Sequence, residues 1–150
     1  MRPVLSADEM RWCDEFTIKK LCVPGLLLME NAGSAVARTV QDRVGPLAGK
    51  TIAIFCGKGN NGGDGFVVAR MMVHGGVNTV VLLVGTDFKV KGDARTNLEI
   101  LKKLQKTATS LQVKKFSTAA LKDLRPDIIV DAIFGTGFSG KVREPVSKAI

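Results

Sequence analysis

The pattern of hydrophobic positions changes near residue 50. Before that point, apolar residues recur at helical intervals over residues 7–21 and again over residues 26–44. Ser6 and Glu9 have the spacing of a capping box at the start of the first stretch, and Gly45-Pro46 is a typical helix stop after the second. The sequence therefore predicts two N-terminal helices within residues 6–45.

Beyond residue 50, short apolar runs rich in β-branched residues alternate with helical stretches. The expected strands are residues 51–55, 79–84, 111–116 and 127–132, and the expected helices are residues 65–74, 93–106 and 118–124. Such alternation predicts a mainly parallel sheet with helices on both faces, because parallel strands need long, right-handed crossovers. The expected fold class is α/β, a doubly wound sandwich in one domain over residues 1–150 with its core in residues 50–150.

Composition narrows the class of protein without changing this picture. With 150 residues, 45% of them hydrophobic, the chain can bury a core of its own, which excludes a disordered protein. Its longest apolar runs fall far short of the roughly 20 residues that cross a membrane, and no apolar leader of the secretory kind follows Met1. Three cysteines without a CxxC spacing, and one histidine, favour neither disulfides nor zinc. We expect a cytoplasmic or mitochondrial protein, with a secreted form left open.

The chain is strongly basic, with 22 Lys and Arg against 14 Asp and Glu and a net charge of +8. Much of the excess lies between residues 101 and 125, in Lys102, Lys103, Lys106, Lys114, Lys115, Lys122 and Arg125. Such a tract attracts nucleic acid or a phosphorylated ligand. Because Phe116 is its only aromatic residue, we expect the tract to be a solvated face, with binding of nucleic acid or of a phosphorylated ligand as the alternative.

A glycine-rich loop follows the first expected strand directly. Residues 56–65 read Cys-Gly-Lys-Gly-Asn-Asn-Gly-Gly-Asp-Gly, and Gly57, Gly59 and Gly62 have the GxGxxG spacing between a strand and a helix. Glycine lets backbone approach a ligand closely, and a helix start directs free N–H groups at an anion. The loop therefore predicts phosphate or nucleotide binding, with a merely tight turn as the alternative.

A second glycine-rich segment follows the last expected strand, where Gly135, Gly137 and Gly140 repeat the same spacing. Ligands of open parallel sheets bind beyond the carboxyl ends of the strands. Both segments leave such ends, so we expect them to face one crevice at a switch point of the sheet. The alternative for the second segment is an ordinary strand-to-helix turn.

Two carboxylates near these segments, Asp131 and Asp64, each have two possible roles. Asp131 ends an apolar strand and either holds a cation, with amide oxygens from Asn60 and Asn61, or caps the following turn. Asp64 either caps a helix start or accepts hydrogen bonds from ligand hydroxyls. His74 is expected at the surface near a helix end, and Cys56 is expected to be a small buried residue.

Three motifs, in this order, resemble the YjeF N-terminal domain family, whose enzymes are NAD(P)H-hydrate epimerases. The motifs are Glu30-Asn31-Ala32-Gly33, residues 57–65 followed by Val67, Ala69 and Arg70, and residues 131–137. The resemblance covers residues 5–150. It implies a Rossmann-like three-layer αβα sandwich, a homodimer, hydrated NADH or NADPH as substrate and a bound potassium ion.

The resemblance also implies site residues at matched positions. The substrate would contact Asn60, Asn61, Gly62, Gly63, Asp64, Gly135, Thr136, Gly137, Phe138, Ser139, Gly140 and Lys141, and potassium would bind Asn61 and Asp131. A Val-Asp-Ile-Pro-Ser-Gly type motif of the family is absent, so we expect a C-terminally truncated form with an incomplete sheet that ends in a helix from about Pro145. The family's likeliest proton-transferring acid lies in that motif, which leaves the catalytic residue unassigned and Asp64 as a candidate.

The reaction that the resemblance implies is interconversion of the R and S forms of hydrated NADH and NADPH. One alternative is a non-catalytic binding module, since some family members are scaffolds in RNA-decapping assemblies or apolipoprotein-binding proteins. Another is a nicotinamide dehydrogenase with Asp87 on the ribose. The lack of any tyrosine and of a catalytic histidine argues against hydride chemistry.

Overall fold

The computed structural model describes residues 4–85, 90–142, 144 and 147. Its strands are β1 (Thr51–Cys56), β2 (Asn78–Leu83), β3 (Leu111–Lys115) and β4 (Ile128–Ala132). Its helices are α1 (Ala7–Lys19), α2 (Gly25–Val44), α3 (Asn60–His74), α4 (Gly92–Leu104) and α5 (Thr118–Leu121). The strands form one parallel sheet in the order β3-β2-β1-β4. The predicted α/β class and parallel sheet are confirmed.

The four strands end at nearly the same register position as the central strand β1. Cys56, its last residue, pairs with Leu83 on β2 and with Ala132 on β4. Leu83 pairs in turn with Lys115, the last residue of β3. All four carboxyl ends therefore lie along the same edge of the sheet, where α/β proteins place their ligands.

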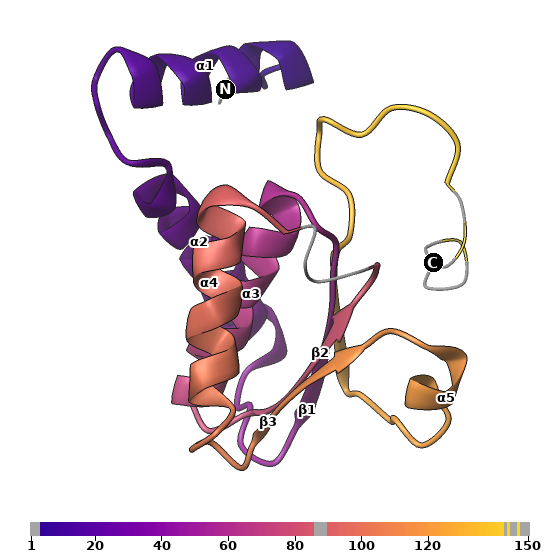
Figure 1. Ribbon diagram of the computed structural model, residues 1–150. Coiled ribbons are helices and arrows are strands. Elements are labelled where there is room, and N and C mark those ends of the chain that lie inside the picture. Colours follow the sequence, from indigo (N-terminus) through magenta and orange to yellow (C-terminus); the bar gives the residue numbers. More distant parts are fainter. Residues whose placement is uncertain (1–3, 86–89, 143, 145–146, 148–150) are drawn as a thin grey trace.

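The two faces of the sheet are covered unequally (Figure 1). On one face, Ile52 and Ile54 belong to a large core with buried residues of α2, α3 and α4. On the other face, Ala53 and Phe55 belong to a smaller cluster that α5 and its flanking loops cover. The described structure thus has helices on both faces, as predicted, but the second layer is thin, and Ile129 of β4 is 64% exposed.

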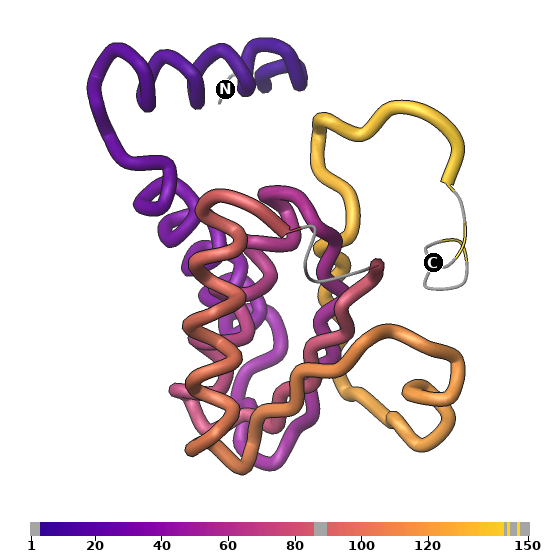
Figure 2. Tube along the Cα trace, in the orientation of Figure 1, coloured from indigo at the N-terminus to yellow at the C-terminus, as the bar shows by residue number. Residues whose placement is uncertain are grey.

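The N-terminal helices differ in how they attach to the core. Helix α2 packs against α3 and ends at Val44; the next residue, Gly45, has φ 75° and ψ −143°, a conformation that is open mainly to glycine. Helix α1 has no buried residue and stands apart from the sheet (Figure 2). Its predicted capping box is confirmed, because Glu9 N–H donates to Ser6 Oγ over 3.3 Å and Ser6 N–H donates to Glu9 Oε2 over 2.7 Å. No helix within the described residues is long and apolar enough to span a membrane.

The largest difference from the predicted elements is the start of α3. The sequence predicts a helix from residue 65, whereas α3 begins at Asn60, because the short turn 57–59 already reverses the chain. Residues 60–64 therefore belong to a helix and not to a loop. The expected helix from about Pro145, and Asp87, lie outside the described residues.

Candidate functional site

The first glycine motif forms a helix start that exposes free backbone donors. Gly59 is the N-terminal cap of α3, and the first backbone hydrogen bond of the helix runs from Gly63 N–H to Gly59 O over 3.1 Å. The N–H groups of residues 60–62 precede that bond and have no partner inside the helix. They point from the positive end of the helix dipole past the carboxyl end of β1, which is a suitable place for a phosphate.

Most glycines of this motif let parts of the protein approach each other. A β-carbon on Gly57 would lie 2.0 Å from Ile133 O, and one on Gly62 would lie 2.0 Å from Gly57 O. Gly63 and Gly65 are confined by side chains, since a β-carbon would lie 2.5 Å from Met29 Sδ and 2.7 Å from Cys56 Sγ, respectively. The sequence interpretation, close approach of a ligand, is therefore incomplete: these positions need glycine for packing. Gly59 differs, since a β-carbon there would meet no atom within 4 Å.

Asn61 joins the two glycine segments. Its side-chain Nδ2 donates to Phe134 O over 2.8 Å, and a β-carbon on Gly135 would lie 3.3 Å from the Asn61 Cβ. Gly57 N–H donates to Ala132 O over 3.0 Å at the base of the same junction. The two segments therefore start side by side beyond β1 and β4, and the expected crevice between them stays a prediction.

The second glycine segment, residues 135–141, is exposed along its whole length. It turns through a hydrogen bond from Phe138 N–H to Gly135 O over 3.1 Å, and the Phe134 and Phe138 rings stack with centroids 3.8 Å apart. From α1, Arg11 Nη1 donates to Thr136 O over 3.1 Å. Within the described residues, no helix begins between Gly135 and Val142. The helix expected from about Pro145 lies outside them, so the alternative of an ordinary strand-to-helix turn stays a prediction.

Asp131 caps the turn that follows β4. Its Oδ1 accepts a hydrogen bond from Ile133 N–H over 2.9 Å, and the residue is exposed. The capping alternative is therefore correct, and it uses one carboxylate oxygen. Within the described residues, Asp131 Oδ2 and Asn61 Oδ1 make no hydrogen bond that would occupy them. Carboxylate and amide oxygens suit a hard cation, and both side chains are tied to the short segment 133–134, so the pair fits a monovalent cation site.

Asp64 lies in the second turn of α3, so the suggestion that it caps the helix is wrong. The side chain is half-buried. Burial, assisted by the negative charge of Asp14 on α1, raises the pKa of Asp64 to about 6. A carboxyl group with such a pKa exchanges a proton readily near neutral pH, and its place one turn after the free N–H groups puts it next to the candidate anion site.

The remaining sequence expectations concern residues outside the chemistry. His74 ends α3 at the surface and Cys56 is 1% exposed, as predicted, and burial raises the pKa of the Cys56 thiol. The first family motif has a structural role that sequence reasoning missed. Glu30 forms an ion pair with Arg70, and Gly33 lets α2 approach α3, because its β-carbon would lie 2.5 Å from Val67 Cβ. The only hint of these contacts in the sequence is that the family resemblance includes both the motif at residues 30–33 and Val67 and Arg70 of the next motif.

Comparison with known protein families agrees with this arrangement. Residues 25–150 match the family described as YjeF-related protein N-terminus. The chain belongs to this family. The crystal structure of yeast ynu0 has the same fold, with a TM-score of 0.80 and 30% identity over 99% of this chain and 63% of the yeast chain.

Relatives in the YjeF family carry names that describe repair of nicotinamide nucleotides. The NAD(P)H-hydrate epimerase of Nitrosopumilus maritimus is 40% identical over 82% of this chain and 55% of its own length. The NAD(P)H-hydrate epimerase of Limosilactobacillus reuteri is 33% identical over 98% of this chain and 65% of its own length. The bifunctional NAD(P)H-hydrate repair enzyme Nnr of Salinibacter ruber is 40% identical over 99% of this chain. The chain spans 29% of that relative and less than two thirds of each of the others.

Proposed function

We propose that this chain carries the epimerase function of its relatives and interconverts the R and S forms of hydrated NADH and NADPH. The observation that supports the proposal is the junction at Asn61, where a helix start with free N–H groups meets an exposed glycine segment. This junction lies between β1 and β4, where the sheet order reverses and dinucleotides bind in related folds. The substrate residues expected from the sequence begin on either side of it, with residues 60–64 on α3 and residues 135–141 in the second segment. Neither the described residues nor the names of the relatives favour the alternative of a binding module.

The reaction needs little more than placement and a proton. The reacting carbon carries a hydroxyl group next to the ring nitrogen, so its configuration is lost when either the C–N bond opens or the hydroxyl leaves. Either route requires a group that donates and accepts a proton near neutral pH. We assign that role to Asp64, because its pKa of about 6 provides both protonation states and it is adjacent to the helix start.

Potassium is the ion that the family resemblance implies, and Asn61 and Asp131 are the residues that would hold it. A cation bound there would offset the negative charge of the substrate phosphates. In this chain, Asn61 would contribute its amide oxygen while its N–H group keeps the second glycine segment in place. Asp131 would contribute the carboxylate oxygen that does not cap the turn.

The test is a time course with the 150-residue chain and R-enriched hydrated NADPH, in which both epimers are resolved by chromatography with and without potassium. We expect conversion faster than the spontaneous rate, and slower conversion without potassium. Asp64→Asn should abolish most of the enzymatic rate, whereas Asp42→Asn, the same change at an exposed position of α2, should retain it. Spontaneous conversion only, from a chain whose circular dichroism is that of a folded protein, would refute the proposal.

We further propose a homodimer that buries the apolar side of α1. Trp12 and Phe16 stack with ring centroids 5.2 Å apart but remain 65% and 41% exposed. Met10 and Ile18 of the same helix are also more than 40% exposed, but at 3.6 residues per turn they lie on another side of it, so the proposed interface rests on Trp12 and Phe16. Exposed apolar patches of this kind mark interaction surfaces. Sedimentation analysis should give a dimer that Trp12→Ala weakens, and a wild-type monomer would refute it.

The three free cysteines fit the expected cytoplasmic or mitochondrial location.

A further inference from the structure

One side of α1 makes the contacts of this helix with the candidate site. Arg11, Asp14 and Ile18 follow one another at helical spacing, which places them on the same side of the helix. The exposed rings of Trp12 and Phe16 lie on another side. Helix α1 lies at the end of the molecule toward which the strands run (Figure 1). It therefore uses different sides for the proposed dimer and for contacts within its own chain.

Arg11 connects this side of α1 to the second glycine segment. Its Nη1 donates to Thr136 O over 3.1 Å and so joins residues 125 positions apart. The same guanidinium pairs with Asp8 on its own helix. The second segment is exposed along its whole length, so it depends on polar contacts of this kind, and not on burial, to keep one position.

Asp14 and Ile18 bring α1 to the other parts of the site. Burial, and then the negative charge of Asp14, raise the pKa of Asp64 on α3, so the two carboxyl groups lie near each other. A β-carbon on Gly25, the first residue of α2, would lie 3.5 Å from Ile18 Cδ1. Helix α1 therefore reaches from the first glycine segment to the second and spans the junction at Asn61.

The chain turns sharply between α1 and α2. Leu21 N–H donates to Phe16 O and Val23 N–H donates to Thr17 O, each over 3.2 Å. Between these donors, Cys22 has a φ of 56°, a left-handed conformation that is uncommon for residues other than glycine. Because α1 has no buried residue, this turn and the polar contacts of the helix, rather than a packed core, determine where it lies.

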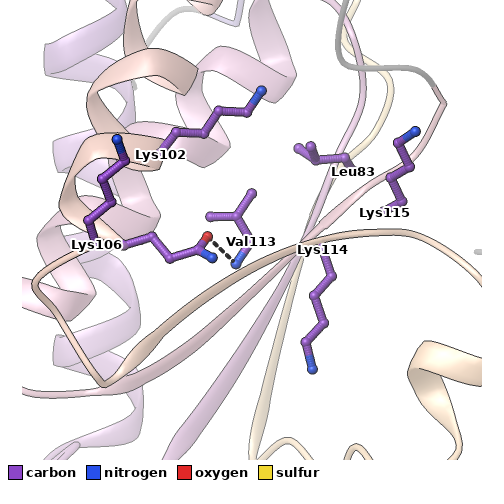
Figure 3. Close-up of a pocket in the computed structure, with 7 residues that line it drawn as sticks. Leu83, Lys102, Lys106, Val113, Lys114 and Lys115 are labelled. Atoms are coloured by element: carbon purple, nitrogen blue, oxygen red, sulfur yellow. Dashed lines mark hydrogen bonds between the residues drawn. The ribbon is translucent and has the colours of Figure 1, made fainter.

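The basic groove between α4 and β3 does not offer a comparable arrangement. Its volume is about 400 Å³, and Lys102, Lys106, Lys114 and Lys115 are among the residues that line it. These side chains extend in different directions, and their ammonium groups do not meet at one place (Figure 3). The contact of Arg11, in contrast, ends on a segment where the substrate is expected.

We propose that α1 forms a third wall of the substrate site and that Arg11 is a positioning residue, which holds the second glycine segment against the bound nucleotide. The inference rests on the proposed function, because the substrate must lie between residues 60–64 and residues 135–141. It adds α1, a part of the chain that the expected substrate contacts do not include. Arg11 acts through the backbone of Thr136 and moves no proton, so its role lies in binding and not in the chemical step.

The kinetic test separates binding from chemistry. Arg11→Ala should raise KM for hydrated NADPH about tenfold, the usual loss for one hydrogen bond from a charged group. It should change kcat by less than about twofold, because it weakens binding and leaves Asp64 in place. Arg11→Lys should recover most of the loss in KM, since an ammonium group can donate to the same carbonyl oxygen.

The matched control is Lys19→Ala. It also removes a positive charge and an ion pair within α1, here with Glu15, but from another side of the helix. Both kinetic constants should therefore stay at their wild-type values. A fall in kcat with an unchanged KM in Arg11→Ala, or an equal rise of KM in Lys19→Ala, would overturn the inference.

A binding test separates this inference from the proposed reaction. ADP-ribose has the pyrophosphate of both substrates but no nicotinamide ring, so its binding requires no catalysis. We expect it to slow amide hydrogen exchange in residues 60–64, in residues 135–138 and in residues 11–17 of α1, and in Arg11→Ala to slow exchange in residues 60–64 alone. Slower exchange in residues 60–64 alone, or in none of these segments, in the wild type would overturn the third wall even if the chain is an active epimerase. The expected pattern in a chain that shows only spontaneous conversion would overturn the proposed reaction alone.

Discussion

The two glycine segments have the same GxGxxG spacing but opposite physical roles. In the first, Gly57 and Gly62 are buried, and a β-carbon on either would lie 2.0 Å from a backbone oxygen. In the second, Gly137 is exposed and a β-carbon there would meet no atom within 4 Å. The first segment is a tightly packed part of the core, and the second segment is an exposed loop beyond the end of the sheet. A spacing motif therefore does not by itself distinguish a packing requirement from a ligand contact.

The largest expected effect comes from adding a methyl group to the first segment. Gly62→Ala should lower the free energy of unfolding by about 3 kcal/mol or more, since the new β-carbon overlaps Gly57 O and neither backbone can move independently. The higher helix propensity of alanine offsets only about 1 kcal/mol of this cost. Denaturant unfolding measures the change.

The matched control is Gly137→Ala in the second segment. Its free energy of unfolding should stay within about 0.5 kcal/mol of the wild-type value, as for most surface substitutions. If the two variants lose stability equally, the contrast between a rigid and a surface segment is wrong.

The sequence predicted the sheet better than the site. The central strands β1 and β2 were foreseen because their apolar runs are buried on both faces, as at Ile52 to Phe55. The start of α3 was missed because residues 60–64 contain two glycines and two asparagines, which local propensity assigns to a loop. Tertiary contacts decided otherwise, since Gly62 and Gly63 make the helix start fit between β1, α2 and α4. The hydrogen bond from Asn61 to Phe134 joins residues 73 positions apart, and no local pattern contains it.

A second prediction concerns that hydrogen bond. Asn61→Ala removes the side-chain link to Phe134 O and should cost about 1 kcal/mol of unfolding free energy. Its more diagnostic effect is local: amide hydrogens of residues 135–138 should exchange faster, whereas those of β1 should not. Asn60→Ala is the control, because Asn60 is exposed and its substitution should leave exchange in both regions unchanged. Uniformly faster exchange in Asn61→Ala would show that the segments are not separable.

A third prediction uses the half-buried carboxyl group of Asp64 in the first segment. The pKa of Asp64 is raised from 3.8 to about 6, so the folded chain retains a proton that the unfolded chain has released between these values. Stability from this group is complete below about pH 4 and is lost as pH rises through about 6. Asp64→Asn should remove this loss and stabilise the chain at pH 8 by about 1 kcal/mol, a value reduced for partial exposure. Unfolding curves at pH 4 and pH 8 test it, and equal effects at both would contradict the assigned pKa.

The smallest expected effect lies in the contact between α1 and the second segment. Arg11 donates to Thr136 O over 3.1 Å and also pairs with Asp8 on its own helix. Because these groups are exposed, Arg11→Ala should change the unfolding free energy by less than about 0.5 kcal/mol. It should nevertheless speed amide exchange in residues 135–138, since α1 has no buried residue that would hold it near the segment by packing.

Asp8→Asn distinguishes the two contacts of Arg11. It breaks the ion pair within α1 but leaves the guanidinium free to donate to Thr136 O, so exchange in residues 135–138 should match the wild type. If Asp8→Asn loosens the segment as much as Arg11→Ala does, the ion pair positions the arginine, and α1 reaches the segment only through it. If neither variant speeds amide exchange, the position of the second segment depends on the hydrogen bond of Asn61 and not on α1. The first segment, with its packed glycines, then determines where the second segment lies.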